Sequence, residues 1–273
     1  MKTSVLLVSY NHELYIEEAI SSILMQRTSF DYEIIVVDDC STDRTKEITE
    51  GCLKKTEVKY KILESEKNLG IAKNYQRGFE NCFSEYIAVL EGDDYWTDPY
   101  RLQKHIDFLD KHKECVMTFN RASLSFVEKK AFAISNCLVN ISDKYYATKD
   151  IITGAPAFNF STYVYRNSAI KMLDKGIFDL NIADWMLNIC ISQYGLICGL
   201  GEVMSVYRVH SKGSWSGISQ IKQHWYGIQL AKEYDRFLNY RLKKEFMIVK
   251  LKNWKGLFRS IIVKIIKIFL FIK

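Results

Sequence analysis

Four short apolar runs rich in β-branched residues recur in the first hundred positions of the chain, with stretches of helical periodicity between them. The apolar runs, which are typical of buried strands, are Ser4–Val8, Glu33–Val37, Lys59–Leu63 and Tyr86–Leu90. The helical stretches are Tyr15–Leu24, Thr45–Leu53 and Ile71–Phe83. Because right-handed crossovers return each helix to the sheet, this alternation predicts an α/β fold with a mostly parallel central sheet and helices on both faces.

Polar residues follow three of the four predicted strands where each strand ends. They are Ser9-Tyr10-Asn11, Asp38-Asp39 and Glu91-Gly92-Asp93-Asp94. Ligands bind at the carboxyl ends of parallel strands, so we expect the three clusters to face one crevice. The turn after the first strand lacks the G-x-G-x-x-G pattern that a nicotinamide dehydrogenase requires, and it also lacks the glycine-rich loop of a sugar-phosphate nucleotidyltransferase.

The adjacent carboxylates of Asp93 and Asp94 are costly at the end of a buried strand, because like charges repel and raise each other's pKa. A bound cation removes that cost. Carboxylate oxygens suit Mg²⁺ or Mn²⁺, and two of them leave coordination positions that substrate phosphates can fill. The alternative is a capping turn, in which Asp94 or Asp98 caps a helix expected over Pro99–Lys111.

A second carboxylate pair, Asp38 and Asp39, ends another predicted strand. A parallel sheet brings both carboxylate pairs to the same edge. A shared ligand site explains this convergence better than two separate helix caps do. Asp39 is then available to a base or to ribose hydroxyls, while Asp38 caps locally through Ser41 or Thr42, one of which is expected to open the second helix. The alternative is a plain strand-to-helix turn, where these residue types are favoured anyway.

Four motifs agree in order and spacing with one known family. They are Val5–Asn11 (VLLVSYN), Ile35–Asp43 (IVVDDCSTD), Asn68–Asn74 (NLGIAKN) and Tyr86–Asp94 (YIAVLEGDD). The chain resembles the inverting family 2 glycosyltransferases, which have the GT-A fold with a Rossmann-like central sheet. The resemblance is strong over about the first 110 residues and continues more loosely to about Trp215.

The resemblance implies a nucleotide-sugar donor, with UDP favoured over dTDP as the carrier. By this likeness Tyr10 stacks on the base, Asp39 binds the base or ribose, and Lys73 lies near the nucleotide. Cys40 and Lys73 depart from the residues most frequent in the family, but neither removes a required chemical group. The nucleotide-sugar-binding residues implied in this way are Ser9, Tyr10, Asn11, Asp39, Asn68, Lys73 and Asp93.

The resemblance also implies a divalent metal, Mn²⁺ or Mg²⁺. Asp93 and Asp94 correspond to the family's DxD-type motif, in which Asp94 ligates the metal directly and Asp93 contacts ribose or metal. His210 lies in a segment similar to the one that supplies a late histidine ligand, although a lone histidine is often structural. Glu91 has no assigned role.

Asp184 matches the family's catalytic base, an acidic residue that starts a helix before an aromatic side chain. It would remove the acceptor hydroxyl's proton while that oxygen attacks the anomeric carbon, which inverts the centre. The alternative is that Asp184 only caps the helix. Trp185 and Trp215 fit either the core or an acceptor platform. A non-catalytic scaffold with the same fold also stays open.

The C-terminal segment Trp254–Lys273 is apolar with only positive charges, and the net charge is +6. Basic residues gather from Arg236 onward, which favours a membrane surface over nucleic acid. An interfacial helix on the cytoplasmic face of the inner membrane is favoured over a packed core helix or a spanning one. Seven cysteines without metal-ligand spacing indicate a reducing compartment.

The simplest division of the chain is a catalytic domain over residues 1–230 and a helical region with a basic, membrane-associating tail over 231–273. Within the first, residues 1–115 form the nucleotide-binding half and residues 116–230 the acceptor-binding half. A membrane-surface glycosyltransferase suggests a glycan or polyprenyl-diphosphate-linked acceptor, as in assembly of bacterial capsule, O-antigen or other surface polysaccharide.

Overall fold

The computed structural model describes residues 1–134, 144–154, 159–180, 184–211, 213, 215 and 217–271. Its strands are β1 (Thr3–Ser9), β2 (Tyr32–Asp38), β3 (Lys59–Leu63), β4 (Tyr86–Glu91), β5 (Tyr95–Trp96), β6 (Cys115–Phe126), β7 (Ala131–Ile134), β8 (Lys144–Tyr146), β9 (Tyr163–Arg166) and β10 (Leu196–Val209). Its α-helices are α1 (Ile16–Leu24), α2 (Thr45–Leu53), α3 (Ile71–Glu80), α4 (Arg101–Lys111), α5 (Thr148–Thr153), α6 (Asn167–Lys171), α7 (Asp184–Ile191), α8 (Gln220–Phe237) and α9 (Lys243–Phe271). Two short 3₁₀ helices are η2 (Phe160–Thr162) and η3 (Lys175–Asp179).

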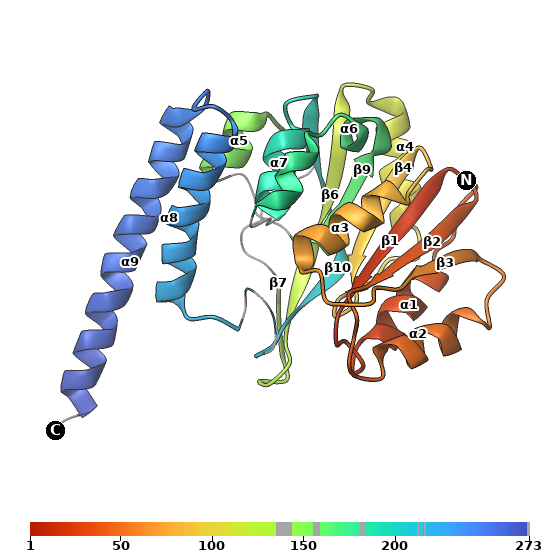
Figure 1. Cartoon of the computed structure of the whole chain (residues 1–273), viewed down its shortest axis with the longest axis horizontal. Coiled ribbons are helices and arrows are strands. Elements are labelled where there is room, and N and C mark those ends of the chain that lie inside the picture. Colours follow the sequence, from red (N-terminus) through yellow and green to blue (C-terminus); the bar gives the residue numbers. More distant parts are fainter. Residues whose placement is uncertain are drawn as a thin grey trace.

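The described strands form one sheet in the order β3-β2-β1-β4-β9-β6-β10-β5, with β7 beside β6 and β8 beside β10 (Figure 1). The first four are parallel to one another, and the long β6 and β10 are parallel as well. The shorter strand β9 runs antiparallel between β4 and β6 and joins the two parts. The predicted α/β fold with helices around a largely parallel sheet is confirmed.

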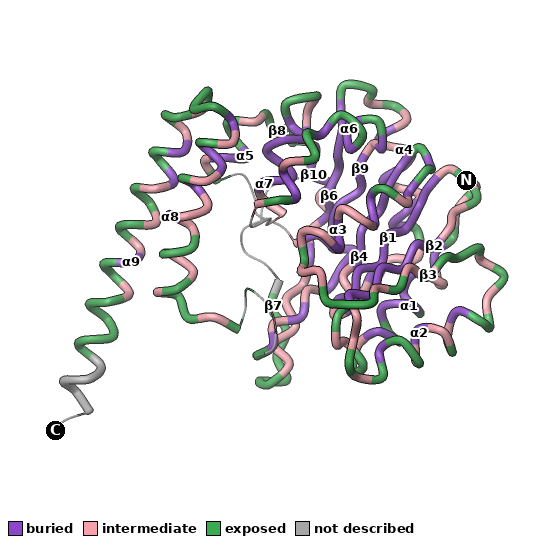
Figure 2. Tube along the Cα trace, viewed as in Figure 1, coloured by how far each residue is buried: buried purple, intermediate pink, exposed green. Residues whose placement is uncertain are grey.

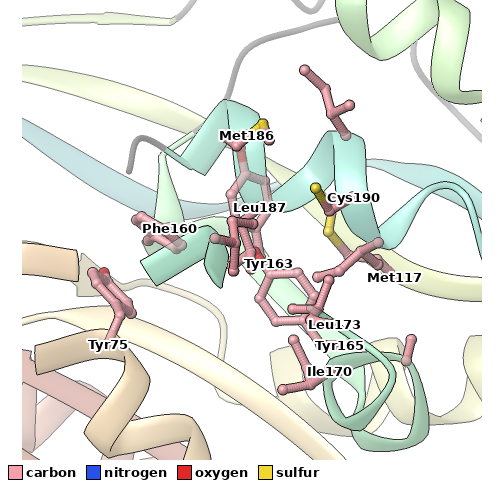
Figure 3. Close-up of a cluster of buried hydrophobic side chains, with 14 of the residues drawn as sticks. Tyr75, Met117, Phe160, Tyr163, Tyr165, Ile170, Leu173, Met186, Leu187 and Cys190 are labelled. Atoms are coloured by element: carbon pink, nitrogen blue, oxygen red, sulfur yellow. The ribbon is translucent and has the colours of Figure 1, made fainter. Parts of the chain in front are cut away.

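Alternate residues of the central strands supply the cores on the two faces of the sheet. Val5 and Leu7 point to the side covered by α1, α2 and α4, whereas Leu6 and Val8 point to the side of α3, α7 and α8. All four are buried, which is why β1 reads as a continuous apolar run (Figure 2). On the α3 side, the rings of Tyr75 and Phe160 stack with centroids 4.0 Å apart (Figure 3).

Two helix starts differ from the prediction. The helical stretch predicted over Thr45–Leu53 is α2, but Ser41 and Thr42, one of which was expected to open it, lie in the turn ahead of its N-cap, Arg44. The reason is that the Ser41 hydroxyl donates to Asp38 (2.6 Å), while Asp43 accepts the backbone N–H of Thr45 (2.9 Å). These contacts build a longer turn before the first helical residue.

The helix expected from Pro99 begins two residues later, at Arg101. Asp98 accepts the backbone N–H of Tyr100 (2.8 Å), so it closes a turn ahead of α4. After α4, the long strand β6 forms an antiparallel hairpin with β7.

Helices α8 and α9 pack on each other as an arm outside the sheet, and α9 extends well beyond the rest of the molecule (Figure 1). Trp185 of α7 joins the arm to the body, because its ring packs against Tyr234 of α8 and Phe246 of α9. Its indole N–H also donates to the carbonyl of Ile151 (2.9 Å). Trp185 is therefore partly buried and packed against the core, whereas Trp215 is 48% exposed.

The beginning of α9 is packed and its later part is open. Phe246 is fully buried, and Val249 and Leu257 nearly so, whereas residues 261–266 are all exposed (Figure 2). Within the described residues, no helix combines the length and apolar composition needed to cross a membrane. The division of the chain at residue 230 stays a prediction.

We expect Phe246→Ala to lower the free energy of unfolding by about 3–5 kcal/mol, since it deletes a fully buried aromatic side chain between α9 and Trp185. Met247→Ala is the matched control, because Met247 is the next residue and 44% exposed, and its change should stay within about 0.5 kcal/mol. Urea unfolding of the two variants measures the difference; equal losses would mean that the arm does not pack as described.

Candidate active site

The three polar clusters lie together at the carboxyl ends of β1, β2 and β4. The Ser9 hydroxyl donates to Asp38 (3.0 Å), and Asn11 accepts the backbone N–H of Thr42 (2.8 Å). The N–H of Gly92 donates to the carbonyl of Val8 (2.8 Å), which holds the fourth-strand cluster against the first. The three polar clusters therefore meet at one edge of the sheet, and their role as a ligand site stays a prediction.

Asp93 lies between two histidines that come from distant parts of the chain. His210, just past β10, has Nε2 3.1 Å from the Asp93 carboxylate, and His12, just past β1, has Nε2 3.7 Å from the same oxygen. Burial raises the pKa of Asp93, but the hydrogen bond of His210 and the charges of both histidines outweigh it and lower that pKa overall. Asp93 is thus an anion flanked by two imidazoles.

Asp94 has a different environment, because its oxygens are occupied by hydrogen bonds from the protein. One accepts the backbone N–H of Arg208 (2.9 Å) and the other accepts the hydroxyl of Ser161 (2.6 Å) and the amide of Asn159. The side chain is fully buried. Burial and the neighbouring charge of Asp93 raise the pKa of Asp94 well above its usual value.

Arg208 fastens the loop that carries both aspartates. Its guanidinium donates to the carbonyl of Asp93 (2.6 Å), pairs with Glu18, and lies over the rings of Tyr15 and Tyr95. Sequence reasoning missed Arg208. The signal was available, because Arg208 stands two positions before His210, and alternate residues of an extended chain lie on the same side.

Glu91 completes the group of acidic residues. Ligand atoms of Glu91, Asp93 and Asp94 all lie within 4.8 Å of one another, close enough for a metal site. The Tyr75 hydroxyl donates to Glu91 (3.1 Å). Burial, followed by the charges of Asp93, Asp94 and Asp184, raises the pKa of Glu91 well above its usual value. The sequence had given Glu91 no role.

The residues expected at the nucleotide lie along the other end of the same edge. Asp39 accepts the backbone N–H groups of Leu69 (2.8 Å) and Gly70 (2.9 Å), and the amide of Asn68 donates to the carbonyl of Asp39 (3.3 Å). Tyr10 is 43% exposed, so its ring is open to a ligand. Lys73 pairs with Asp179 of η3.

Asp184 opens α7 and contacts Tyr163, one of the buried side chains labelled in Figure 3. The Tyr163 hydroxyl is 3.4 Å from one carboxylate oxygen, and the other oxygen accepts the backbone N–H of Trp185 (2.7 Å). Burial raises the pKa of Asp184 to about 7, although both hydrogen bonds act in the opposite direction. A carboxylate with such a pKa exchanges protons near neutral pH.

The profile of Glycosyl transferase family 2 matches residues 4–167. The chain belongs to this family. The uncharacterized protein Rv1520 of Mycobacterium tuberculosis is 30% identical over 223 residues, which are 81% of this chain and 63% of that protein. The chain therefore spans less than two thirds of the length of this family relative.

Solved structures with low sequence identity share the fold. Staphylococcus aureus TarS in complex with UDP-GlcNAc matches with a TM-score of 0.66 at 21% identity, over 95% of this chain and 79% of that one. The mannosyltransferase PcManGT of Pyrobaculum calidifontis, in complex with GDP-Man and Mn²⁺, matches with a TM-score of 0.66 at 16% identity, over 95% and 72% of the two chains. The fold is the GT-A fold expected from the sequence.

Proposed function

We propose that the chain is an inverting glycosyltransferase that moves a sugar from a nucleotide-sugar donor, a UDP-sugar first, to a hydroxyl group of its acceptor. The observation that carries the proposal is the 3.1 Å contact between the Asp93 carboxylate and His210 Nε2. Asp93 follows β4 and His210 follows β10, and Tyr10 and Asp39 follow β1 and β2 at the same edge of the sheet. A carboxylate and an imidazole brought together from 117 positions apart fit a metal–nucleotide site better than a capping turn.

The side chains fit a divalent metal through the chemistry of their donor atoms. Oxygen and imidazole ligands suit Mn²⁺, and Mg²⁺ is the alternative. When bound, the metal supplies a positive charge that stabilises the departing diphosphate. Asp93 and His210 are the proposed ligands, with Glu91 beside them. Asp94 belongs to the acidic group by distance, but its oxygens already accept protein hydrogen bonds, so we assign it the task of holding the loop.

The donor nucleotide is proposed to lie along β1, β2 and the segment after β3. Tyr10 offers an exposed ring for stacking on the base. Each oxygen of the buried Asp39 carboxylate accepts one backbone N–H and keeps a further lone pair for the base or ribose. Ser9, Asn11 and Asn68 shape this end of the site, while Lys73 stands at its entrance. TarS with UDP-GlcNAc and PcManGT with GDP-Man support a nucleotide-sugar ligand for this fold.

Asp184 is the proposed general base. Its carboxylate takes the proton of the acceptor hydroxyl while that oxygen forms a bond to the anomeric carbon. The bond from the anomeric carbon to the diphosphate oxygen breaks on the opposite face, and its electron pair leaves with the nucleotide. A single displacement of this kind inverts the anomeric centre and needs no covalent intermediate. The pKa of about 7 suits this proton transfer.

The proposal is tested by a donor-hydrolysis screen over UDP-, dTDP- and GDP-sugars with Mn²⁺, Mg²⁺ or EDTA. We expect turnover with a UDP-sugar and Mn²⁺, slower turnover with Mg²⁺, and none with EDTA. NMR of the released sugar, recorded before its anomers interconvert, should show the anomeric configuration opposite to that of the donor. Undiminished turnover in EDTA, or retention of configuration, would contradict the mechanism.

The proposed acceptor is a lipid-linked glycan of a surface polysaccharide, of the capsule or O-antigen kind. The proposed partner of α9 is the anionic cytoplasmic face of the inner membrane.

Helix α9 has one exposed apolar stripe, whose residues recur at helical spacing: Leu251, Trp254, Phe258 and Ile262. Glu245 is the only acidic residue of α9, and the remaining charges are Lys and Arg. Exposed apolar side chains flanked by cations suit an anionic bilayer. TarS of Staphylococcus aureus, named as a poly(ribitol-phosphate) beta-N-acetylglucosaminyltransferase, supports a polymeric acceptor.

Replacing the stripe residues Leu251, Phe258 and Ile262 with Ser should abolish co-sedimentation of the chain with vesicles containing anionic lipid. The wild-type chain should bind these vesicles, bind neutral vesicles less, and be released by high salt, because the Lys and Arg contribution is screened. The matched control replaces the exposed residues Phe83 and Tyr60, which lie near β3 and far along the chain from α9. Unchanged sedimentation of the stripe variant would refute the membrane partner.

A further inference from the structure

His12 has a geometry that the proposed reaction leaves unexplained. Its backbone is fixed at the start of α1, because its N–H donates to the Thr45 hydroxyl (2.7 Å) and its carbonyl accepts the N–H groups of Tyr15 and Ile16 (both 2.9 Å). The side chain is 19% exposed, and Nε2 is 3.7 Å from Asp93 Oδ2, slightly longer than a hydrogen bond. The imidazole is therefore aimed at the carboxylate by a rigid backbone.

The other ring nitrogen of His12 determines which atom carries the proton. Nδ1 is buried and has no hydrogen-bond partner. A proton there would be a buried donor without an acceptor, whereas a proton on Nε2 faces the negative charge of Asp93. A histidine that ligates a metal through Nε2 normally donates its Nδ1–H to a second group. His12 has no such acceptor for Nδ1–H, so it is better suited to donate Nε2–H to Asp93 than to ligate a metal.

Gly92 makes this position of the imidazole available. A Cβ atom at residue 92 would lie 2.8 Å from His12 Nδ1 and 2.8 Å from the end of the Ile16 side chain. Real Cβ atoms do not approach other atoms so closely. Gly92 and His12 therefore pack directly against each other, although they are distant in sequence.

We propose that His12 is a positioning residue: its Nε2–H orients the Asp93 carboxylate so that the free oxygen lone pairs face the metal that Asp93 shares with His210. The inference rests on the metal site of the proposed function. Partners that orient a ligand in this way typically change metal affinity by roughly 10–100-fold when they are removed.

The test measures Mn²⁺ binding to the full chain by electron paramagnetic resonance, with no nucleotide or acceptor present. We expect His12→Leu to weaken Mn²⁺ binding by roughly 10–100-fold, and His12→Gln, whose amide N–H reaches the same side, to recover most of it. Leu14→Ala, an exposed neighbour, is the control and should bind as the wild type does. Thermal melts identify any variant that has lost its fold, and His12→Gln keeps the test decisive if His12→Leu fails to fold.

Nitrogen couplings of the bound Mn²⁺ separate the two possible roles of His12. The wild type and His12→Gln should each show one histidine nitrogen, and His210→Gln should show none. Unchanged Mn²⁺ affinity in both His12 variants would overturn the positioning role while leaving the proposed function intact. Two couplings in the wild type, one of them lost in His12→Gln, would make His12 a ligand instead. Equal Mn²⁺ binding in Asp93→Asn would remove the metal site itself, and this role of His12 with it.

Discussion

Replacing Asp184 with Asn is expected to lower kcat by roughly 10²–10⁴-fold, because the variant removes the group that takes the acceptor's proton. The amide keeps the size of the side chain and an oxygen that can accept the N–H of Trp185, so the fold and the affinity for the donor should change little. Steady-state kinetics with saturating donor, together with calorimetric titration of the nucleotide, separates these effects. A kcat within tenfold of the wild type would exclude Asp184 as the base.

The pH profile gives an independent measure of the same group. A general base works only when it is deprotonated, so kcat/KM should rise with pH up to about 7 and then level off. Tyr163 donates toward the carboxylate and so lowers the pKa of Asp184. In Tyr163→Phe the rising limb should therefore move to higher pH. A shift to lower pH would mean that Tyr163 does not stabilise the charged form.

Asp93→Asn is expected to lose metal-dependent turnover by about 10³-fold, because several kcal/mol of leaving-group stabilisation depends on the metal it holds. Asp94→Asn should behave differently. The side-chain amide of this variant has one oxygen acceptor where the carboxylate has two, so it cannot accept from both the Ser161 hydroxyl and the Arg208 N–H. The free energy of unfolding should therefore fall by about 1–3 kcal/mol. The affinity for Mn²⁺ should stay within a few-fold of the wild type.

The two aspartates are matched controls for each other, since they are adjacent in sequence and identical in chemistry. Mn²⁺ titration and urea unfolding on both variants should give opposite orders: metal binding falls most in Asp93→Asn, and stability falls most in Asp94→Asn. If Asp94→Asn is the variant that loses Mn²⁺, Asp94 is the direct ligand, as the family likeness alone implies.

In the first half of the fold, β1, β2 and β4 were predictable because they are buried on both faces, whereas β3 was found although none of its residues is buried. Strands buried on both faces read as unbroken apolar runs. The sequence did not predict the short strands β5, β8 and β9. Two to four residues are too few to show the alternation of apolar and polar residues that marks a strand, and these strands pair with partners distant in sequence. The helix starts were misplaced where Asp43 and Asp98 close turns that the sequence alone does not distinguish from caps.

The site was predictable only where residues sit at strand ends. Asp93 and Asp39 follow this rule, and the family likeness added His210 and Asp184. Ser161 and Asn159, which hold Asp94, lie in η2 and just before it, where no periodicity or motif marks them. Their role follows from β9, which brings this segment beside β4, and the sequence pattern did not predict β9.

Strand β9 also bears on how the chain acquires its structure. It covers the β4 edge through pairs such as Ile87 with Tyr165, and it is made long after β4 during synthesis. If β1–β4 pair before β9 is made, the β4 edge of their sheet is uncovered, and an uncovered apolar edge can pair with other chains. In that case newly made protein is most prone to aggregation after β4 has emerged from the ribosome and before β9 has, and a chaperone that covers the β4 edge would act during this interval.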